Sequence, residues 1–319
     1  IEFERNPLYW NDKETVINSA TFLAIENPST DVARYRAGDL DMTSYGLPPE
    51  QFAKLQKELP GEVYVTRTLA TYSYELNNKK APFDNVNIRK ALNLSLDRNV
   101  ITDKVLGQGQ TPTYVFTTTY IEEGQLIQQP AYSKEPMAQR NEEAIKLLEE
   151  AGYSKANPLK FSILYNTNEN HKKVAIAAAS MWKANTKGLI DVKLENQEWK
   201  TYIDSRRAGR YDAARAGWNA DYNQATTFGN YFLSNSSNNT AKYANPEYDK
   251  AMAESYAATD AEGRAKAYAK AEEILGKDYG IVPIFNYVNP RLVKPYVKGY
   301  SGKDPQDHIY LRNLYIIKH

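Results

Sequence analysis

The sequence of 319 residues contains no cysteine, and its three histidines, His171, His308 and His319, lie far apart along the chain. Disulfide bonds, thiolate metal sites and cysteine nucleophiles are therefore excluded. No His-Glu-x-x-His motif offers a zinc site, and no Gly-x-Ser-x-Gly turn offers a serine nucleophile. The segment from Asp221 resembles the start of a calcium loop, but Thr226 stands where that loop needs glycine. We expect no metal and no catalytic residue.

Signals of several other protein classes are also missing. No Gly-x-Gly-x-x-Gly or Walker motif offers a nucleotide site, so no cofactor is indicated. No apolar run approaches the roughly 20 residues that cross a bilayer, and residues 1–5 do not begin a signal peptide, so we expect a soluble chain. The 40 Lys and Arg residues nearly balance the 39 Asp and Glu residues. Without a net positive field, nucleic acid is not an expected partner.

Tyrosine is abundant, with 25 residues against 9 phenylalanines. A tyrosine combines an apolar ring with a hydroxyl, which suits a partly wet cleft for varied ligands, although many tyrosines simply cover the edges of a core. The chain exceeds the usual size of one domain, so we expect two lobes, or one large lobe with an appendage.

The pattern of apolar residues predicts an α/β protein. Three strands and two helices alternate between residues 159 and 217, which is typical of a parallel sheet with helices on its faces. Residues 107–136 are rich in turn formers and are expected to form a long loop region. The expected helices are 32–37 (capped by 29–31 and ended by Gly38), 49–58, 87–94, 141–151, 171–184, 201–208, 247–257 and 261–275, and the expected strands are 16–24, 39–43, 62–67, 69–77, 159–165, 190–194, 211–217, 280–287 and 314–318.

Two strings of residues carry a family resemblance, 196–202 (NQEWKTY) and 214–223 (ARAGWNADYN). They resemble the periplasmic oligopeptide-binding proteins, the solute receptors of ABC importers, and among these the oligopeptide and murein-tripeptide receptors. The likeness runs along the whole chain and includes 5–7 (RNP), 37–41 (AGDLD), 164–167 (LYNT), 171–173 (HKK), 233–237 (LSNSS), 291–295 (RLVKP) and 315–319 (YIIKH).

The resemblance implies lobes like those of type II periplasmic-binding proteins, with mixed sheets, helices on both faces and a ligand cleft between the lobes. Residues 1–70 with 288–319 would form part of the first lobe, and residues 71–287 the far lobe. N-terminal segments of such receptors would be absent from this chain and would be one of its partners. The other implied partners are an oligopeptide ligand and the transmembrane subunits of an ABC permease, in the periplasm of a Gram-negative type of cell.

The same resemblance implies charged ligand-binding residues. Asp221 would pair with the α-ammonium of a peptide, with a helix N-cap or a plain surface carboxylate as the alternative. Arg215 offers a planar cation for a ligand carboxylate, or else forms a structural ion pair, for instance with Asp221. Arg206 and His171 match family positions that meet the carboxylates of peptides of different lengths. His171 has the alternative of a solvated residue at a helix start.

Further candidates are aromatic or polar. Trp199, Trp218 and Tyr287 would line side-chain pockets, and Asn166 would bond the ligand backbone, with a core role as the alternative for each. Tyr72 and Tyr74 lie on a strand beside the expected hinge and have the same two readings. Asn219 stands where some relatives carry cysteine, which implies a more polar pocket for the first ligand side chain.

Other functions remain open at this point. The same fold serves receptors dedicated to one ligand, such as a murein tripeptide, a dipeptide, haem or glutathione. A peptide hydrolase using Asp and His, and an adhesin or chaperone-like role, are further alternatives. In a receptor, a ligand that contacts both lobes binds the closed state better and shifts the population toward it.

Overall fold

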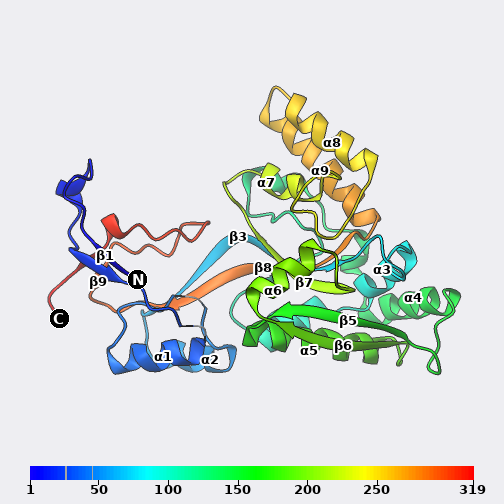
Figure 1. Ribbon diagram of the computed structural model, residues 1–319, viewed down its shortest axis with the longest axis horizontal. Helices are drawn as coiled ribbons and strands as arrows, with labels where there is room; N and C mark the ends of the chain where they lie inside the picture. The colour runs from blue at the N-terminus through cyan, green and yellow to red at the C-terminus, as the bar shows by residue number, and fades with distance from the viewer. Residues whose placement is uncertain (26, 45) are drawn as a thin grey trace. The chain divides into compact units, whose positions relative to one another are not determined.

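The computed structural model describes residues 1–25, 27–44 and 46–319. The chain divides into two compact units (Figure 1). Unit 1 comprises Ile1–Thr68, Leu106–Gly109 and Val288–His319, and unit 2 comprises Leu69–Val105 and Gln110–Tyr287. These limits fall next to the expected limits, with the short segment Leu106–Gly109 added to unit 1.

A six-stranded mixed sheet is the framework of unit 2, with the strand order β4-β8-β3-β7-β5-β6. Strand β5 pairs in parallel with both β6 and β7, as the alternation of strands and helices predicted. Strand β3 runs antiparallel to β7, and β4 runs antiparallel to β8. The strands are β3 (Val63–Leu76), β4 (Thr111–Pro112), β5 (Leu159–Asn166), β6 (Ile190–Gln197), β7 (Ala213–Asn219) and β8 (Ile281–Leu292).

Helices cover both faces of this sheet, which confirms the predicted fold class. Trp182 of α5 packs on Tyr74 of β3, with ring centroids 5.9 Å apart. On the opposite face, Tyr202 of α6 packs with Leu164 and Ala214. The helices of unit 2 are α3 (Val86–Leu94), α4 (Met137–Glu150), α5 (Glu169–Asn185), α6 (Trp199–Arg207), α7 (Thr226–Gly229), α8 (Pro246–Ala257) and α9 (Ala261–Lys277).

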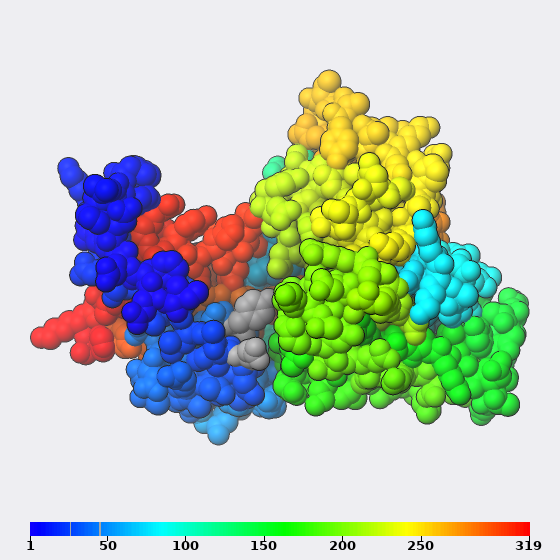
Figure 2. Space-filling model, in the orientation of Figure 1, coloured from blue at the N-terminus to red at the C-terminus, as the bar shows by residue number. Residues whose placement is uncertain are grey.

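One core of unit 2, here called the α7–α9 core, lies where α7, α8 and α9 meet the chain that follows β7. Phe228, Phe232, Tyr248, Met252 and Leu275 are buried there. Figure 2 shows α8 and α9, in yellow and orange, as a raised part of the surface of unit 2. The chain that leaves the end of β7 is therefore fixed on a packed base.

Over its described residues, unit 1 contains two α-helices and two small two-stranded sheets. Its core includes Val32 and Tyr35 of α1, Phe52 and Leu55 of α2, and Leu292. Helix α1 begins one residue after Asn27, whose side chain accepts hydrogen bonds from the next two free amides, so the expected cap at residues 29–31 is wrong. The elements are α1 (Pro28–Ala37), α2 (Pro49–Glu58), β1 (Glu2–Glu4), β2 (Ser19–Thr21), β9 (Val297–Lys298) and β10 (Tyr315–Ile316).

Several expected strands differ from the structure. Residues 62–67 and 69–77 belong to one strand, β3, because the chain stays extended through Thr68. The expected strand 16–24 is reduced to β2, and 39–43 to a single bridge between Met42 and Val293. The expected strand 314–318 is reduced to β10. These segments pair over one to three residues only, so their alternating pattern overstated their length.

Candidate functional site

Arg215 is the central cation of the site in unit 2. It lies in the middle of β7, where its Nη2 donates to the hydroxyl of Tyr287 and its Nη1 lies 3.5 Å from Oδ1 of Asn166. The guanidinium also lies 5.1 Å from the centre of the Tyr72 ring. Burial disfavours its charge, but the neighbouring hydroxyls of Tyr287, Tyr202 and Tyr72 raise the pKa of Arg215. Among the described residues Arg215 has no carboxylate partner, so the alternative ion pair with Asp221 is not formed.

Gly217 lets Arg215 and Tyr287 meet. It lies two residues after Arg215 on β7 and therefore on the same face of the sheet. A Cβ atom on Gly217 would lie 2.9 Å from Nη2 of Arg215 and 2.9 Å from the hydroxyl of Tyr287. The absent side chain leaves the space that these two polar groups share.

Tyr72 and Tyr74 of β3 lie next to Arg215, on the same face of the sheet. Both are buried, and the Tyr72 ring lies 4.7 Å from Phe285 and 5.8 Å from Tyr287 between ring centroids. Within the described part of the chain, the hydroxyls of Tyr72 and Tyr74 have no hydrogen-bond partner. Because both rings are buried, their role in the structure is to pack against Arg215. Direct contact of Tyr72 or Tyr74 with a ligand stays a prediction.

His171 lies in the first turn of α5 and joins the same cluster. Its ring centroid is 5.6 Å from that of Tyr72, and its backbone amide donates to Oδ1 of Asn168 over 3.1 Å. Burial, together with the positive charge of Arg215, lowers the pKa of His171 well below its ordinary value. The residue is half-buried, so the alternative of a fully solvated helix start does not hold.

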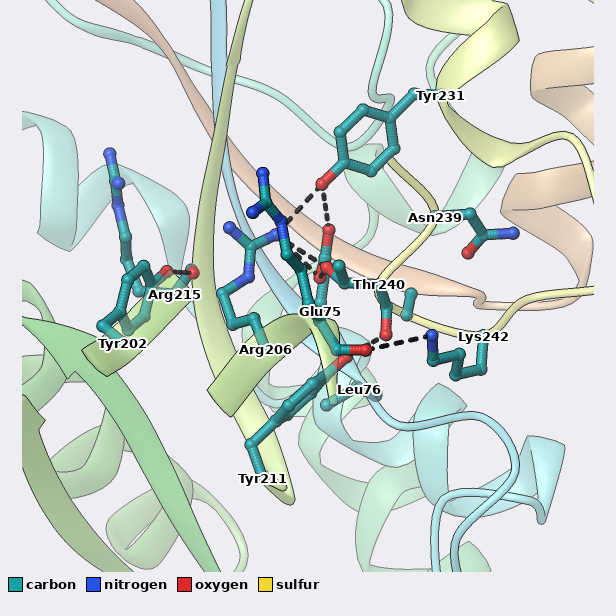
Figure 3. A network of polar contacts seen from close by, with 12 residues as sticks. Glu75, Leu76, Tyr202, Arg206, Tyr211, Arg215, Tyr231, Asn239, Thr240 and Lys242 are labelled. Atoms are coloured by element: carbon teal, nitrogen blue, oxygen red, sulfur yellow. Dashed lines mark hydrogen bonds and ion pairs between the residues drawn. The ribbon is translucent and has the colours of Figure 1, made fainter. Parts of the chain in front are cut away.

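Arg206 lies on the opposite face of the sheet, in a separate buried network (Figure 3). Its Nη2 is 2.9 Å from Oε2 of Glu75 and 3.0 Å from the hydroxyl of Tyr231. Burial disfavours the charge of Arg206, but the Glu75 carboxylate outweighs it and raises the pKa of Arg206. Figure 3 shows the Arg215 side chain extending away from Glu75, while its carbonyl accepts a hydrogen bond from the hydroxyl of Tyr202. Because Arg206 already has a carboxylate partner, its contact with a ligand carboxylate stays a prediction.

Asp221 follows the end of β7 and is exposed. Its Oδ2 accepts a hydrogen bond of 3.4 Å from the hydroxyl of Thr227, and its backbone amide donates to the same hydroxyl over 3.1 Å. No ion-pair partner of Asp221 occurs in the described part of the chain. Asp221 is not a helix cap, because the N-cap of α7 is Ala225. The structure thus leaves an exposed, uncompensated carboxylate.

The remaining candidates are Trp199 at the start of α6 and Trp218 and Asn219 at the end of β7. Trp218 is half-buried, and its ring centroid lies 4.9 Å from that of Tyr231 in the α7–α9 core. Trp199 is 55% exposed at the start of α6, so the alternative core role is wrong for it. Asn219, the last residue of β7, is also exposed. Trp199 and Asn219 are therefore accessible to a ligand.

Sequence reasoning missed the residues that position the candidates. Glu75, Tyr202 and Thr227 hold Arg206, the Arg215 backbone and Asp221, and no motif singled them out. Gly217 did have a signal, since a glycine inside a predicted strand often marks a close approach of other groups.

The structure also contributes two negative findings. Within residues 1–25, 27–44 and 46–319, no helix is long and apolar enough to cross a membrane. Over the same residues, no group of three or more His, Asp or Glu side chains is placed to hold a metal ion.

Comparison with known proteins places this geometry in context. The sequence profile described as "Bacterial extracellular solute-binding proteins, family 5 Middle" matches residues 1–240. The periplasmic oligopeptide-binding protein OppA of Haemophilus influenzae is 99% identical over 319 residues, a match that covers 100% of this chain and 59% of that protein. The protein of the same name from Salmonella typhimurium is 54% identical, with 100% of this chain and 58% of that protein covered.

A solved structure agrees with these sequence matches. The crystal structure of Haemophilus influenzae OppA in complex with RPPGFSPFR has a TM-score of 0.96 and 98% identity, and the match covers 100% of this chain and 62% of that one. The chain thus spans about three fifths of the length of the relatives that it matches.

Proposed function

The chain belongs to family 5 of the bacterial extracellular solute-binding proteins, and from this membership we propose that the protein is a periplasmic receptor that binds oligopeptides and delivers them to an ABC importer. The names of its relatives and the RPPGFSPFR complex support an oligopeptide as the ligand. Recognition by the transmembrane subunits of a permease is part of the proposal and rests on the family alone.

One observation in unit 2 carries the proposal. Asp221 and Arg215 lie six positions apart at and beyond β7, and neither has an ion-pair partner among the described residues. Every free peptide carries an α-ammonium group at its N-terminus and an α-carboxylate group at its C-terminus, whatever its sequence. A carboxylate and a guanidinium that are both uncompensated suit such a ligand, because a binding site gains most from charges that the protein does not already neutralise.

The surroundings of the two charges favour selection by termini over selection by side chains. Trp199 and Asn219 are exposed and present an aromatic face and a polar amide to the ligand side chains. Neither group demands a particular side chain, because an indole ring packs on many groups and an amide both donates and accepts hydrogen bonds. The proposal therefore includes tolerance of varied peptide sequences.

Replacement of Asp221 by Asn tests the proposal. We expect Asp221→Asn in the full-length protein to weaken binding of RPPGFSPFR by roughly ten- to a hundredfold, because a hydrogen bond to a charged group contributes about 1.5–3 kcal/mol. Isothermal titration calorimetry with RPPGFSPFR and with its N-acetylated form measures the effect. The acetylated peptide has no ammonium, so the variant and the parent protein should bind it equally.

The matched control is Asp191→Asn, which neutralises an exposed carboxylate of β6 that already pairs with Lys183. This control should leave the affinity for RPPGFSPFR unchanged. Equal affinity of Asp221→Asn and the parent protein for the free peptide would refute the ammonium role. Native mass spectrometry of the purified protein separates the two ligand classes: a range of peptide masses supports the broad receptor, and one discrete mass supports a dedicated ligand.

A further inference from the structure

At and beyond the end of β7, two residues, Trp218 and Asp221, hydrogen-bond to the hydroxyl group of Thr227. The hydroxyl of Thr227 accepts hydrogen bonds from Nε1 of Trp218 over 3.2 Å and from the amide of Asp221 over 3.1 Å. It donates its own hydrogen to Oδ2 of Asp221 over 3.4 Å. We call Trp218, Asp221 and Thr227 the Thr227 clamp.

The clamp uses the full bonding capacity of the hydroxyl. A threonine hydroxyl has two acceptor lone pairs and one hydrogen. The two N–H groups, of Trp218 and Asp221, occupy both lone pairs, which directs the single hydrogen toward the Asp221 carboxylate. An exposed aspartate would otherwise sample several rotamers. The Thr227 hydrogen bond favours one of them.

Thr227 itself is fixed by burial and by the turn that precedes it. It is 3% exposed, and its neighbour Phe228 is buried in the α7–α9 core. The intervening turn is held by Glu123, whose Oε2 accepts from the amide of Ala225 over 3.1 Å and whose Oε1 lies 3.4 Å from Nε of Arg264. The clamp therefore joins an exposed carboxylate to a rigid base.

We propose that Thr227 is a positioning residue for peptide binding, which holds the Asp221 carboxylate and the Trp218 indole as a preset pair for the N-terminal end of the ligand. This inference rests on the proposed function and adds a residue that determines affinity without touching the peptide. A preset carboxylate loses little conformational freedom on binding, so the ammonium contact is realised in full. The indole N–H is also kept from competing for the carboxylate, since Thr227 satisfies it.

Two variants separate the hydroxyl from the shape of the side chain. Thr227→Val keeps the volume and removes all three hydrogen bonds, whereas Thr227→Ser keeps the hydroxyl and removes the methyl group. We expect Thr227→Val to weaken binding of RPPGFSPFR by the full-length protein about tenfold, and Thr227→Ser to stay within about threefold of the parent. N-acetyl-RPPGFSPFR, which lacks the ammonium, should bind all three proteins within about threefold.

A double-mutant cycle tests whether Thr227 acts through Asp221. In the Asp221→Asn background, Thr227→Val should change the affinity for RPPGFSPFR by less than about twofold, because the carboxylate that it positions is already gone. An equal tenfold loss in both backgrounds, or an equal loss for free and acetylated peptide, would overturn the proposal and leave Thr227 a structural residue. The proposal is also overturned if Asp221→Asn weakens binding of RPPGFSPFR and Thr227→Val does not.

Failure of the proposed function has a different signature, in which Asp221→Asn itself leaves affinity unchanged. Circular dichroism and thermal denaturation check that each variant is folded. If Thr227→Val does not fold, Thr227→Ala takes its place with the same expected loss. Unfolding of both variants would overturn the positioning role in favour of a structural one.

Discussion

At the scale of the residue, Gly217 controls the position of the Arg215 guanidinium because it has no side chain to occupy that space. The two groups that a Cβ would meet, Nη2 of Arg215 and the hydroxyl of Tyr287, are the far ends of flexible side chains. They can move aside without distorting the backbone, so an added methyl group should cost little stability. It should displace the guanidinium from the space that it shares with the Tyr287 hydroxyl.

We therefore expect Gly217→Ala to weaken binding of RPPGFSPFR by roughly ten- to a hundredfold, because the displaced guanidinium loses a charge-assisted hydrogen bond to the ligand carboxylate, while the free energy of unfolding changes by less than about 1 kcal/mol. Calorimetric titration and urea denaturation measure the two quantities. Gly276→Ala is the matched control, since a Cβ there meets nothing within 4 Å, and it should leave affinity unchanged. A parallel loss of stability and affinity in Gly217→Ala would contradict this account.

At the scale of the element, the buried pair of Glu75 and Arg206 ties β3 to α6. Tyr231 and Thr240 add hydrogen bonds to Glu75 from the chain that follows α7. A buried charge without its partner is costly, because neither water nor another ion replaces the lost interaction. The pair therefore fixes the helix that carries Trp199.

Glu75→Gln should lower the free energy of unfolding by about 3–5 kcal/mol, since it leaves the Arg206 charge buried without a carboxylate. The double variant Glu75→Leu with Arg206→Met removes both charges and should lose less than Glu75→Gln alone. Urea denaturation followed by circular dichroism compares them. Lys54→Ala, which removes an exposed pair with Glu58, should change stability by less than about 1 kcal/mol. A loss in Glu75→Gln as small as that of Lys54→Ala would show that the pair is not structural.

The helices were easier to predict than the strands, for a physical reason. A helix carries its signals locally: residues 49–58, with proline in the first turn, were predicted with the limits of α2. A strand depends on a partner distant in the sequence, so the length of β2 or β10 could not be deduced from alternation alone. The site divides in the same way. The resemblance named Arg215 and Asp221, whereas Glu75 and Thr227 matter through contacts that only the fold creates.

At the scale of the whole molecule, every predicted site residue lies in unit 2. A ligand that binds there stabilises the folded form of that unit by an amount that grows with the ratio of its concentration to Kd. At a peptide concentration of a hundred times Kd, this contribution is about 2.7 kcal/mol.

Differential scanning calorimetry of the full-length protein should therefore show one transition that rises by roughly 5–10 °C with RPPGFSPFR at that concentration. Asp221→Asn at the same peptide concentration should show a smaller rise. Identical scans with and without peptide would contradict binding to the folded chain.

The different surroundings of the tryptophans have an optical consequence. Trp182 is buried and donates its N–H to the carbonyl of Leu92 over 2.9 Å, whereas Trp199 is 55% exposed and lies 5.8 Å from the ring of Tyr202. The hydroxyl of Tyr202 donates to the Arg215 carbonyl, so Tyr202 contacts both the Trp199 ring and the backbone of Arg215. An aqueous quencher such as acrylamide reaches the indoles of Trp199 and of Trp10, which is 85% exposed, and not that of Trp182. With Trp10 replaced by phenylalanine, Trp199 becomes a quenchable emission probe in unit 2, with Trp182 as a shielded internal reference.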